Sequence, residues 1–321
     1  MKFYNNVLEL VGNTPLVRLN NVIKKKNVTV LAKLECINPG GSVKDRIGIK
    51  MVNYAEAKGL IRPGATIVEP TSGNTGVGLA QVAAVRGYKT VFVMPEKMSK
   101  EKELLLKAYG ADVIRTPTAV APDDPRSNYK VSERIAKEST NAFRPNQYEN
   151  MNNPAAHFET TGPEIWRDTE GKISHFVACL GTGGTVNGTG KFLKSKSRKV
   201  KVIGVDPEGS IFYDRFYHRK ESFHTYKLEG IGEDFVPGTT DLTAMDDIIK
   251  VSDKESFLMT RDIVRREGLF VGGSSGAAAL AASKLVKKLK RGVVVVLFPD
   301  TGRNYLSTIF NDEWMKSNGF L

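Results

Sequence analysis

Residues 175–185 read HFVACLGTGGT, a short apolar run followed at once by a loop of glycine and threonine. We expect residues 175–178 to form a strand buried on both faces, because their apolar character is largely continuous and does not alternate. The glycines of the loop allow a ligand to approach the backbone closely, and the threonines add donors, which suits a phosphate. The loop is not a P-loop, because Gly190-Lys191 is followed by Phe192.

Two further loops of this kind precede helical stretches. Residues 69–76 read EPTSGNTG and residues 272–276 read GGSSG. Backbone N–H groups at a helix N-terminus bind anions, so a substrate carboxylate would suit the first of them. Any one loop could be no more than a tight strand-to-helix turn. Because ligands bind at the carboxyl ends of strands in open α/β sheets, three such loops in one chain favour a shared binding site.

The rest of the chain continues this alternation of strands and helices. The predicted strands are residues 28–34, 66–69, 90–94, 112–115, 175–178, 201–205 and 293–298. The predicted helices are residues 47–57, 75–85, 100–109, 255–266 and 275–289. This order predicts an α/β protein with parallel sheets, and seven or more strands suggest two sheets in two lobes.

One lysine stands out by its position. Residues 38–46 read NPGGSVKDR, so Lys44 follows a Pro-Gly-Gly-Ser turn and opens a helical stretch beside Arg46. A helix N-terminus and a neighbouring cation favour the neutral, nucleophilic form of a lysine. The alternative is that Lys44 is one surface lysine among many.

Composition excludes several classes of protein. The 321 residues are 40% hydrophobic with a net charge of +12, and the basic runs lack interleaved aromatic residues. We therefore expect solvated lysines and not a nucleic-acid site, which would show salt-sensitive binding. Two cysteines fit a reducing cytoplasm, and no apolar run suits a signal peptide or a membrane span. No metal site is expected, because the histidines make no metal-type spacing: His157, His175, His218 and His224.

Taken together, the motifs resemble the fold-type II pyridoxal-phosphate enzymes, in the branch of cysteine synthases and cystathionine β-synthases. The resemblance covers nearly the whole chain and rests on GNTPL at 12–16, GSVKDR at 41–46, TSGNTG at 71–76, GTGGT at 181–185 and GGSSG at 272–276. It implies a two-lobed, tryptophan synthase β-like fold and a homodimer. Residues 38–147 would form a smaller, mobile substrate-binding lobe. Residues 1–37 and 148–321 would form the larger, cofactor-binding lobe.

The resemblance also implies roles for individual residues. Lys44 would form the Schiff base with pyridoxal phosphate and then act as the base for the α-proton. Ser274 would meet the pyridine nitrogen as a neutral hydroxyl, which favours loss of the β-substituent over transamination. The other predicted cofactor contacts are Asn74 at the phenolic oxygen and Gly181, Thr182, Gly183, Gly184 and Thr185 at the phosphate. The predicted contacts of the substrate carboxylate are Thr71, Ser72 and Thr75, assisted by Gln147.

Finer features resemble cystathionine β-synthase, among them VDPEGS at 205–210, EGIGEDF at 229–235 and FPD at 298–300. The resemblance implies replacement of the β-substituent of serine or O-acetylserine by homocysteine through an aminoacrylate, giving cystathionine. Glu229 could hold the amino group of homocysteine, or merely fix a glycine-flanked loop. Glu233 or Asp234 could act as a base, and Tyr148 could contact the second substrate or simply pack.

Alternatives stay open at this point. The chain could be a cysteine synthase that uses O-acetylserine and sulfide, or could consume cysteine and release hydrogen sulfide with serine or lanthionine as the other product. A non-catalytic paralogue is disfavoured, because such proteins typically lose the lysine or a cofactor loop. We expect no haem and no control by S-adenosylmethionine, because the segments that carry them in animal relatives have no counterpart in the sequence.

Overall fold

Two sheets organise the chain, and both are predominantly parallel. The computed structural model describes Met1 and residues 3–321. The larger sheet runs in the order β1 (Leu16–Arg18), β2 (Val28–Leu34), β10 (Gly292–Phe298), β7 (His175–Cys179), β8 (Lys201–Pro207) and β9 (Asp247–Val251). Its β1–β2 pair is antiparallel and its other pairs are parallel. The smaller, all-parallel sheet runs β5 (Asp112–Thr116), β4 (Lys89–Pro95), β3 (Thr66–Pro70) and β6 (Ala142–Phe143).

This architecture confirms the predicted α/β class, and all seven predicted strands are present. The prediction lacked β1, β6 and β9, which are sheet-edge strands. An edge strand has one hydrogen-bonded neighbour, and β1 and β6 are only 3 and 2 residues long. Such strands carry too short an apolar pattern to be recognised from sequence.

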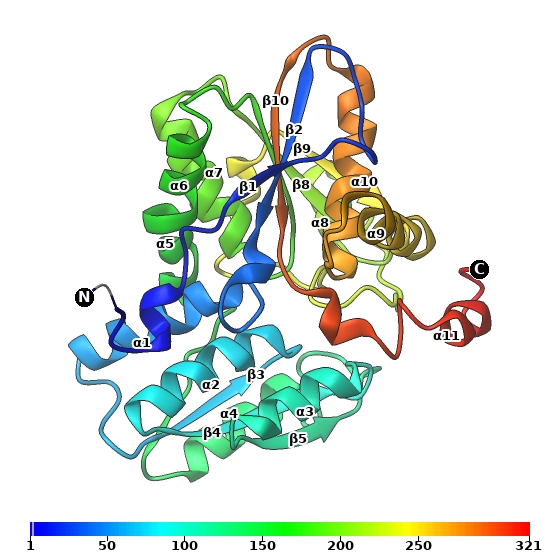
Figure 1. Cartoon of the computed structure of the whole chain (residues 1–321). Helices are drawn as coiled ribbons and strands as arrows, with labels where there is room; N and C mark the ends of the chain where they lie inside the picture. Colours follow the sequence, from blue (N-terminus) through cyan, green and yellow to red (C-terminus); the bar gives the residue numbers. More distant parts are fainter. Residues whose placement is uncertain (2) are drawn as a thin grey trace.

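Helices cover both faces of the larger sheet. Figure 1 shows α5, α6 and α7 on one side of it and α9 and α10 on the other. The helices are α1 (Lys44–Ala57), α2 (Asn74–Arg86), α3 (Lys100–Ala108), α4 (Asn128–Glu138), α5 (Asn152–Ala156), α6 (Gly162–Asp168), α7 (Gly184–Lys196), α8 (Phe212–Phe216), α9 (Asp253–Glu267), α10 (Gly273–Lys288) and α11 (Asp312–Ser317). The predicted helices correspond to α1, α2, α3, α9 and α10.

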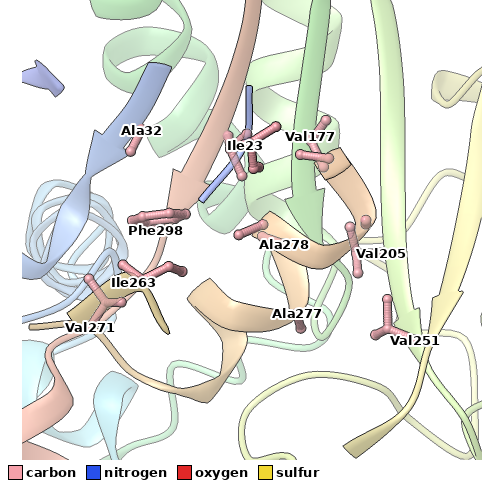
Figure 2. Close-up of a cluster of buried hydrophobic side chains, with 14 of the residues drawn as sticks. Ile23, Ala32, Val177, Val205, Val251, Ile263, Val271, Ala277, Ala278 and Phe298 are labelled. Atoms are coloured by element: carbon pink, nitrogen blue, oxygen red, sulfur yellow. The ribbon is translucent and has the colours of Figure 1, made fainter. Parts of the chain in front are cut away.

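Small side chains let α10 lie close against the sheet. Ala277 and Ala278 are 0% exposed and pack in one cluster with Val177, Val205 and Phe298 of the strands (Figure 2). Burial of such apolar area is the main favourable term in folding. The packing also directs the N-terminal end of α10, with its glycine-serine loop, towards the carboxyl ends of the strands.

Helices α1 and α2 approach each other closely over the smaller sheet. A Cβ atom on Gly48 would lie 2.6 Å from the carbonyl carbon of Gly78, and one on Gly78 would lie 2.6 Å from the carbonyl oxygen of Lys44. Glycine at both positions therefore sets the distance between Lys44 and the start of α2. All strands of the smaller sheet fall within residues 38–147, while the mobility and limits of a lobe there stay predictions.

Loops at the strand ends are joined to one another. The N–H group of Val43 donates to the carbonyl of Pro299 at 2.8 Å, and that of Thr301 donates to Gly41 at 3.0 Å. These bonds hold the turn before Lys44 against the loop after β10. Within the described part of the chain, no helix has the length and apolar character needed to cross a bilayer.

Candidate active site

Two cavities meet at Lys44. The inner one is lined by seven of the eight predicted cofactor residues; the eighth, Gly184, lies within the same glycine loop. The outer one is lined by Ser72, Gln147, Tyr148, Glu233 and Asp234, all predicted to bind substrate. The structure therefore brings these two predicted groups of residues together on either side of one lysine.

Lys44 is half-buried at the junction of the two cavities. Burial lowers the pKa of Lys44 to about 8, and nearby Glu233 opposes this shift. The sequence argument attributed a neutral amine to the helix start and to Arg46. In the structure burial is the largest cause, and the Arg46 guanidinium is bound to Glu35 and Glu164 instead. The conclusion is the same, but its physical reason is corrected.

The loop before α7 has the properties of a phosphate cradle. Gly183 has φ 78°, a left-handed conformation that favours glycine. The N–H groups of Gly181, Thr182 and Gly183 have no acceptor among the described residues. A methyl group on Gly184 would collide with the amide of Asn153, which itself donates to the Thr182 hydroxyl at 2.9 Å. Free donors at a helix N-terminus fit a phosphate group.

A buried histidine lies behind this loop and was missed by the sequence analysis. His157 Nε2 lies 3.2 Å from Thr185 Oγ1, and its Nδ1 lies 2.9 Å from Thr161 Oγ1. Burial holds the pKa of His157 well below its ordinary value, so the ring is neutral. It fixes the Thr185 hydroxyl at the edge of the cradle. A lone histidine in a sequence gives no signal for such a contact.

Asn74 is held by a buried carboxylate. Its Nδ2 donates to Asp300 Oδ2 at 2.9 Å, and the Tyr305 hydroxyl donates to the same oxygen at 2.7 Å. Burial raises the pKa of Asp300, which is 1% exposed. Asp300 belongs to the FPD stretch that supports the resemblance, and Tyr305 lies five residues beyond it. Here they orient Asn74 towards the inner cavity, which Ser274 also lines.

The loop after β3 is shaped by its own hydroxyl groups. The Thr71 hydroxyl accepts from the N–H groups of Gly73 and Gly76 at 3.0 and 3.2 Å. Thr75 donates to Gln147 Oε1 at 2.7 Å. Thr71 and Thr75 are buried and do not line the outer cavity, whereas Ser72 and Gln147 do. Carboxylate binding by these residues stays a prediction.

The three predicted acidic residues are placed differently. Glu229 Oε2 lies 2.7 Å from the ammonium of Lys102, and both side chains are buried. Lys102 therefore already occupies one of its oxygens, while Glu229 also lines the inner cavity, and its contact with homocysteine stays a prediction. Glu233 and Asp234 line the outer cavity. Burial, with Asp234 beside it, raises the pKa of Glu233 to about 8.

Aromatic rings form one wall of the outer cavity. Tyr148 and Tyr129 meet edge to face at 5.2 Å between ring centroids, and Phe235 lies 5.6 Å from each. The Tyr129 hydroxyl lies 3.4 Å from Glu233 Oε2. Tyr148 therefore packs and also lines the cavity, so both of its predicted roles remain compatible with its position.

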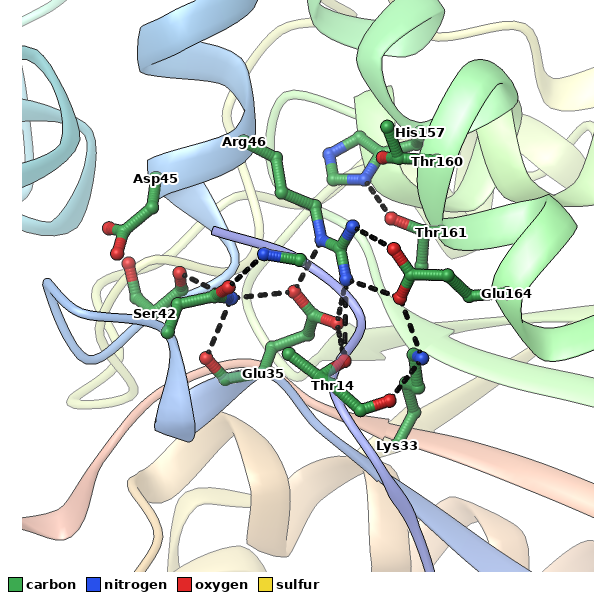
Figure 3. Close-up of polar contacts among 12 residues, drawn as sticks. Thr14, Lys33, Glu35, Ser42, Asp45, Arg46, His157, Thr160, Thr161 and Glu164 are labelled. Atoms are coloured by element: carbon green, nitrogen blue, oxygen red, sulfur yellow. Dashed lines mark hydrogen bonds and ion pairs between the residues drawn. The ribbon is translucent and has the colours of Figure 1, made fainter. Parts of the chain in front are cut away.

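A buried charge cluster lies beneath the start of α1. Arg46 donates to Glu35 and Glu164, while Lys33 donates to Glu164 and to the carbonyl of Thr14 (Figure 3). The partly exposed Asp168 also lies within 3.8 Å of the Lys33 ammonium, so two cations face three carboxylates. Thr14 belongs to the GNTPL stretch, whose role the sequence left unassigned. Among Met1 and residues 3–321, no group of three or more His, Cys, Asp or Glu side chains could hold a metal ion.

Comparison with known proteins agrees with this site. Residues 7–300 match the family described as "Pyridoxal-phosphate dependent enzyme". Cystathionine beta-synthase of Apis mellifera is 47% identical over 323 residues, covering 100% of this chain and 64% of the relative. This chain thus spans less than two thirds of that relative's length. Cysteine synthase of Staphylococcus aureus is 45% identical over 306 residues, covering 95% of this chain and 96% of the relative.

The solved structures give the same result for the fold. A hydrogen sulfide-producing enzyme from Fusobacterium nucleatum superposes with a TM-score of 0.89 at 40% identity. The match covers 95% of this chain and 100% of that protein.

Proposed function

The chain belongs to the family of pyridoxal-phosphate-dependent enzymes, and from this premise we propose that it exchanges the β-substituent of serine or O-acetylserine for the sulfur of homocysteine, giving cystathionine. The observation that carries the proposal is the outer cavity. It opens beside Lys44 and is lined by acidic, basic and aromatic side chains, which suits a second amino acid better than the small sulfide ion.

The residues of the inner cavity fit the cofactor. The free donors of residues 181–183 would bind its phosphate, Asn74 its phenolic oxygen and Ser274 its pyridine nitrogen. When bound, pyridoxal phosphate withdraws electrons from the α-carbon of the substrate. Lys44, whose pKa burial lowers to about 8, would accept the proton from that carbon in its deprotonated form, because a base with a pKa near the working pH transfers protons efficiently.

The loop after β3 would orient the first substrate. Ser72 faces the outer cavity next to Lys44, and Gln147 is fixed by Thr75 and by the carbonyl of Pro70 at 3.1 Å. A carboxylate held there places the α-carbon near the amine of Lys44. The β-substituent would then leave towards the outer cavity, where the incoming thiol binds.

A second candidate function is release of hydrogen sulfide from cysteine. It is favoured by Glu233, whose pKa of about 8 suits a base that activates water or a thiol at neutral pH. With cysteine as the first substrate, the leaving group would be sulfide, and the product serine or lanthionine.

Spectroscopy of the purified holoenzyme tests the proposal. We expect a visible cofactor band that serine or O-acetylserine shifts and that homocysteine then restores, with cystathionine detected by mass spectrometry. Restoration by sulfide but not by homocysteine would favour a cysteine synthase, and sulfide release from cysteine alone would favour the second candidate. If added pyridoxal phosphate gave no visible band, the whole assignment would fail. Assembly as a homodimer and a cytoplasmic location stay predictions.

A further inference from the structure

Charged side chains that lack ion-pair partners gather in the outer cavity. Lys97, Glu233 and Asp234 all line it, together with Lys44. Among the ion pairs between described residues, none within 4.0 Å involves Lys97, Glu233 or Asp234. Unpaired charges that converge on a cavity mark a place where a charged ligand would complete the pairing.

Lys97 is held in position by its surroundings. Its backbone N–H donates to the Thr118 hydroxyl at 2.9 Å, and its ammonium lies 4.8 Å from the centre of the Tyr226 ring. A cation over an aromatic face is stabilised without losing its capacity to bind an anion. Tyr226 is buried, at 8% exposure, so the support beneath Lys97 is rigid.

The acidic pair is equally well fixed. The N–H of Glu233 donates to Ser210 Oγ at 3.1 Å, and its carbonyl accepts from Ile211. The preceding Gly232 has φ 74° and donates to Leu180 at 2.7 Å. The backbone that presents the two carboxylates is therefore anchored from both sides and needs little ordering when a ligand binds.

We propose that Lys97 binds the α-carboxylate of the incoming amino-acid thiol and that Glu233 and Asp234 bind its α-ammonium group. This inference rests on the proposed β-replacement and specifies how its second substrate is recognised. It moves that recognition away from Glu229, whose carboxylate is bound to Lys102. A basic group and two carboxyl groups that line one cavity match the two charged groups of an amino acid.

The arrangement also sets the specificity between nucleophiles. Sulfide carries neither a carboxylate nor an ammonium group, so it cannot contact Lys97 and the two carboxylates at the same time. A homocysteine molecule gains two charge-assisted contacts, and its thiol is directed towards Lys44 and the inner cavity. The site therefore selects an amino-acid thiol over sulfide by electrostatic complementarity.

Truncated thiols separate the two contacts in an experiment on the holoenzyme. The KM for the thiol is measured with L-homocysteine, with 3-aminopropanethiol, which lacks the carboxylate, and with 4-mercaptobutyrate, which lacks the amine. The variants are Lys97→Gln, Glu233→Gln and Asp234→Asn. The control is Lys100→Gln, which removes an equal charge from the exposed start of α3. The visible band of each protein verifies cofactor loading.

Each substitution should weaken the binding only of those thiols that carry the group contacted by the replaced side chain. We expect Lys97→Gln to raise the KM for homocysteine about tenfold or more and to change that for 3-aminopropanethiol little. Glu233→Gln and Asp234→Asn should raise the KM for homocysteine and change that for 4-mercaptobutyrate little. Equal effects of Lys97→Gln on homocysteine and 3-aminopropanethiol would overturn the inference alone. A parent enzyme that converts sulfide but no homocysteine would overturn the proposed function and the inference with it.

Discussion

Replacing Arg46 by methionine tests the role of the buried charge cluster. In the parent protein the guanidinium donates to Glu35, Glu164 and the Thr14 hydroxyl over distances of 2.7–3.3 Å. Methionine retains an unbranched apolar side chain but removes the charge. Arg46 belongs to α1, whereas its partners lie outside residues 38–147. The variant therefore breaks contacts that tie the start of α1 to the rest of the chain.

The size of the expected loss of stability depends on the hydrogen bonds that the carboxylates of Glu35 and Glu164 keep. The side chains of Glu35 and Glu164 are 0% and 8% exposed, so neither can be solvated after the change. Glu35 still accepts from Thr14 and Asn38, and Glu164 still accepts from Lys33. Removing one partner of a buried ion pair costs ~3–5 kcal/mol, and this partial compensation places the expected loss at about 3 kcal/mol. That is a large share of the ~5–15 kcal/mol by which proteins are stable.

The loss of stability caused by Arg46→Met should also depend on pH, and the direction of this dependence can be worked out. Burial favours the neutral acid, but Arg46 and Lys33 hold the pKa of Glu164 at about 2, and Arg46 likewise lowers the pKa of Glu35. Carboxylates with a lowered pKa stabilise the fold above the unfolded value of about 4.3, and that stability disappears as the pH falls towards 2. Without Arg46, burial raises both pKa values. The difference between parent and variant should therefore shrink as the pH is lowered from neutral towards about 5.

Urea unfolding of the cofactor-saturated proteins, followed by circular dichroism, measures this difference. The control is Arg126→Met, because the ion pair of Arg126 with Asp124 lies at the surface and such pairs contribute little. An Arg46→Met midpoint equal to that of the control at neutral pH, with an unchanged slope, would refute the reasoning.

Three further predictions concern the site. The KM for homocysteine should fall as the pH rises through about 8, because Glu233 is neutral below its pKa and binds an ammonium group only when charged; 4-mercaptobutyrate, measured in parallel, reports the ionisation of the thiol and of Lys44 without an ammonium group for Glu233 to bind. Gly184→Ala should weaken cofactor binding in an absorbance titration, because the methyl group meets Asn153, and unchanged affinity would contradict the cradle. Lys102→Met should lower the melting temperature more than the double variant with Glu229→Leu, because only the single variant leaves a buried charge unpaired.

Local sequence patterns predicted the features that one segment determines alone. The strand β10 is a continuous apolar run after its first glycine, and the loop at residues 181–185 combines glycines and threonines within five positions. Both patterns have a direct physical cause, namely burial on two faces and close approach to a ligand. The prediction of the sheets and of the inner cavity depends on such segments, and the structure places them together.

Contacts between distant residues could not be predicted in this way. Lys102 and Glu229 are 127 positions apart, and Asn74 and Asp300 are 226 apart. No periodicity or motif connects the members of either pair. For this reason the sequence left open whether Glu229 holds a substrate or fixes a loop, and it gave Lys97 no role. Which charges are paired is a property of the folded chain.

The difference between paired and unpaired charges distinguishes two groups of residues in the site. Arg46 is surrounded by carboxylates, and Lys102 is bound to Glu229, so each of these buried charges is satisfied within the protein. Lys97 is exposed and Glu233 is half-buried, and neither has an ion-pair partner within 4.0 Å among the described residues, although the cavity they line opens beside Lys44. The pairing of charges thus separates the residues that hold the site together from those left for a substrate.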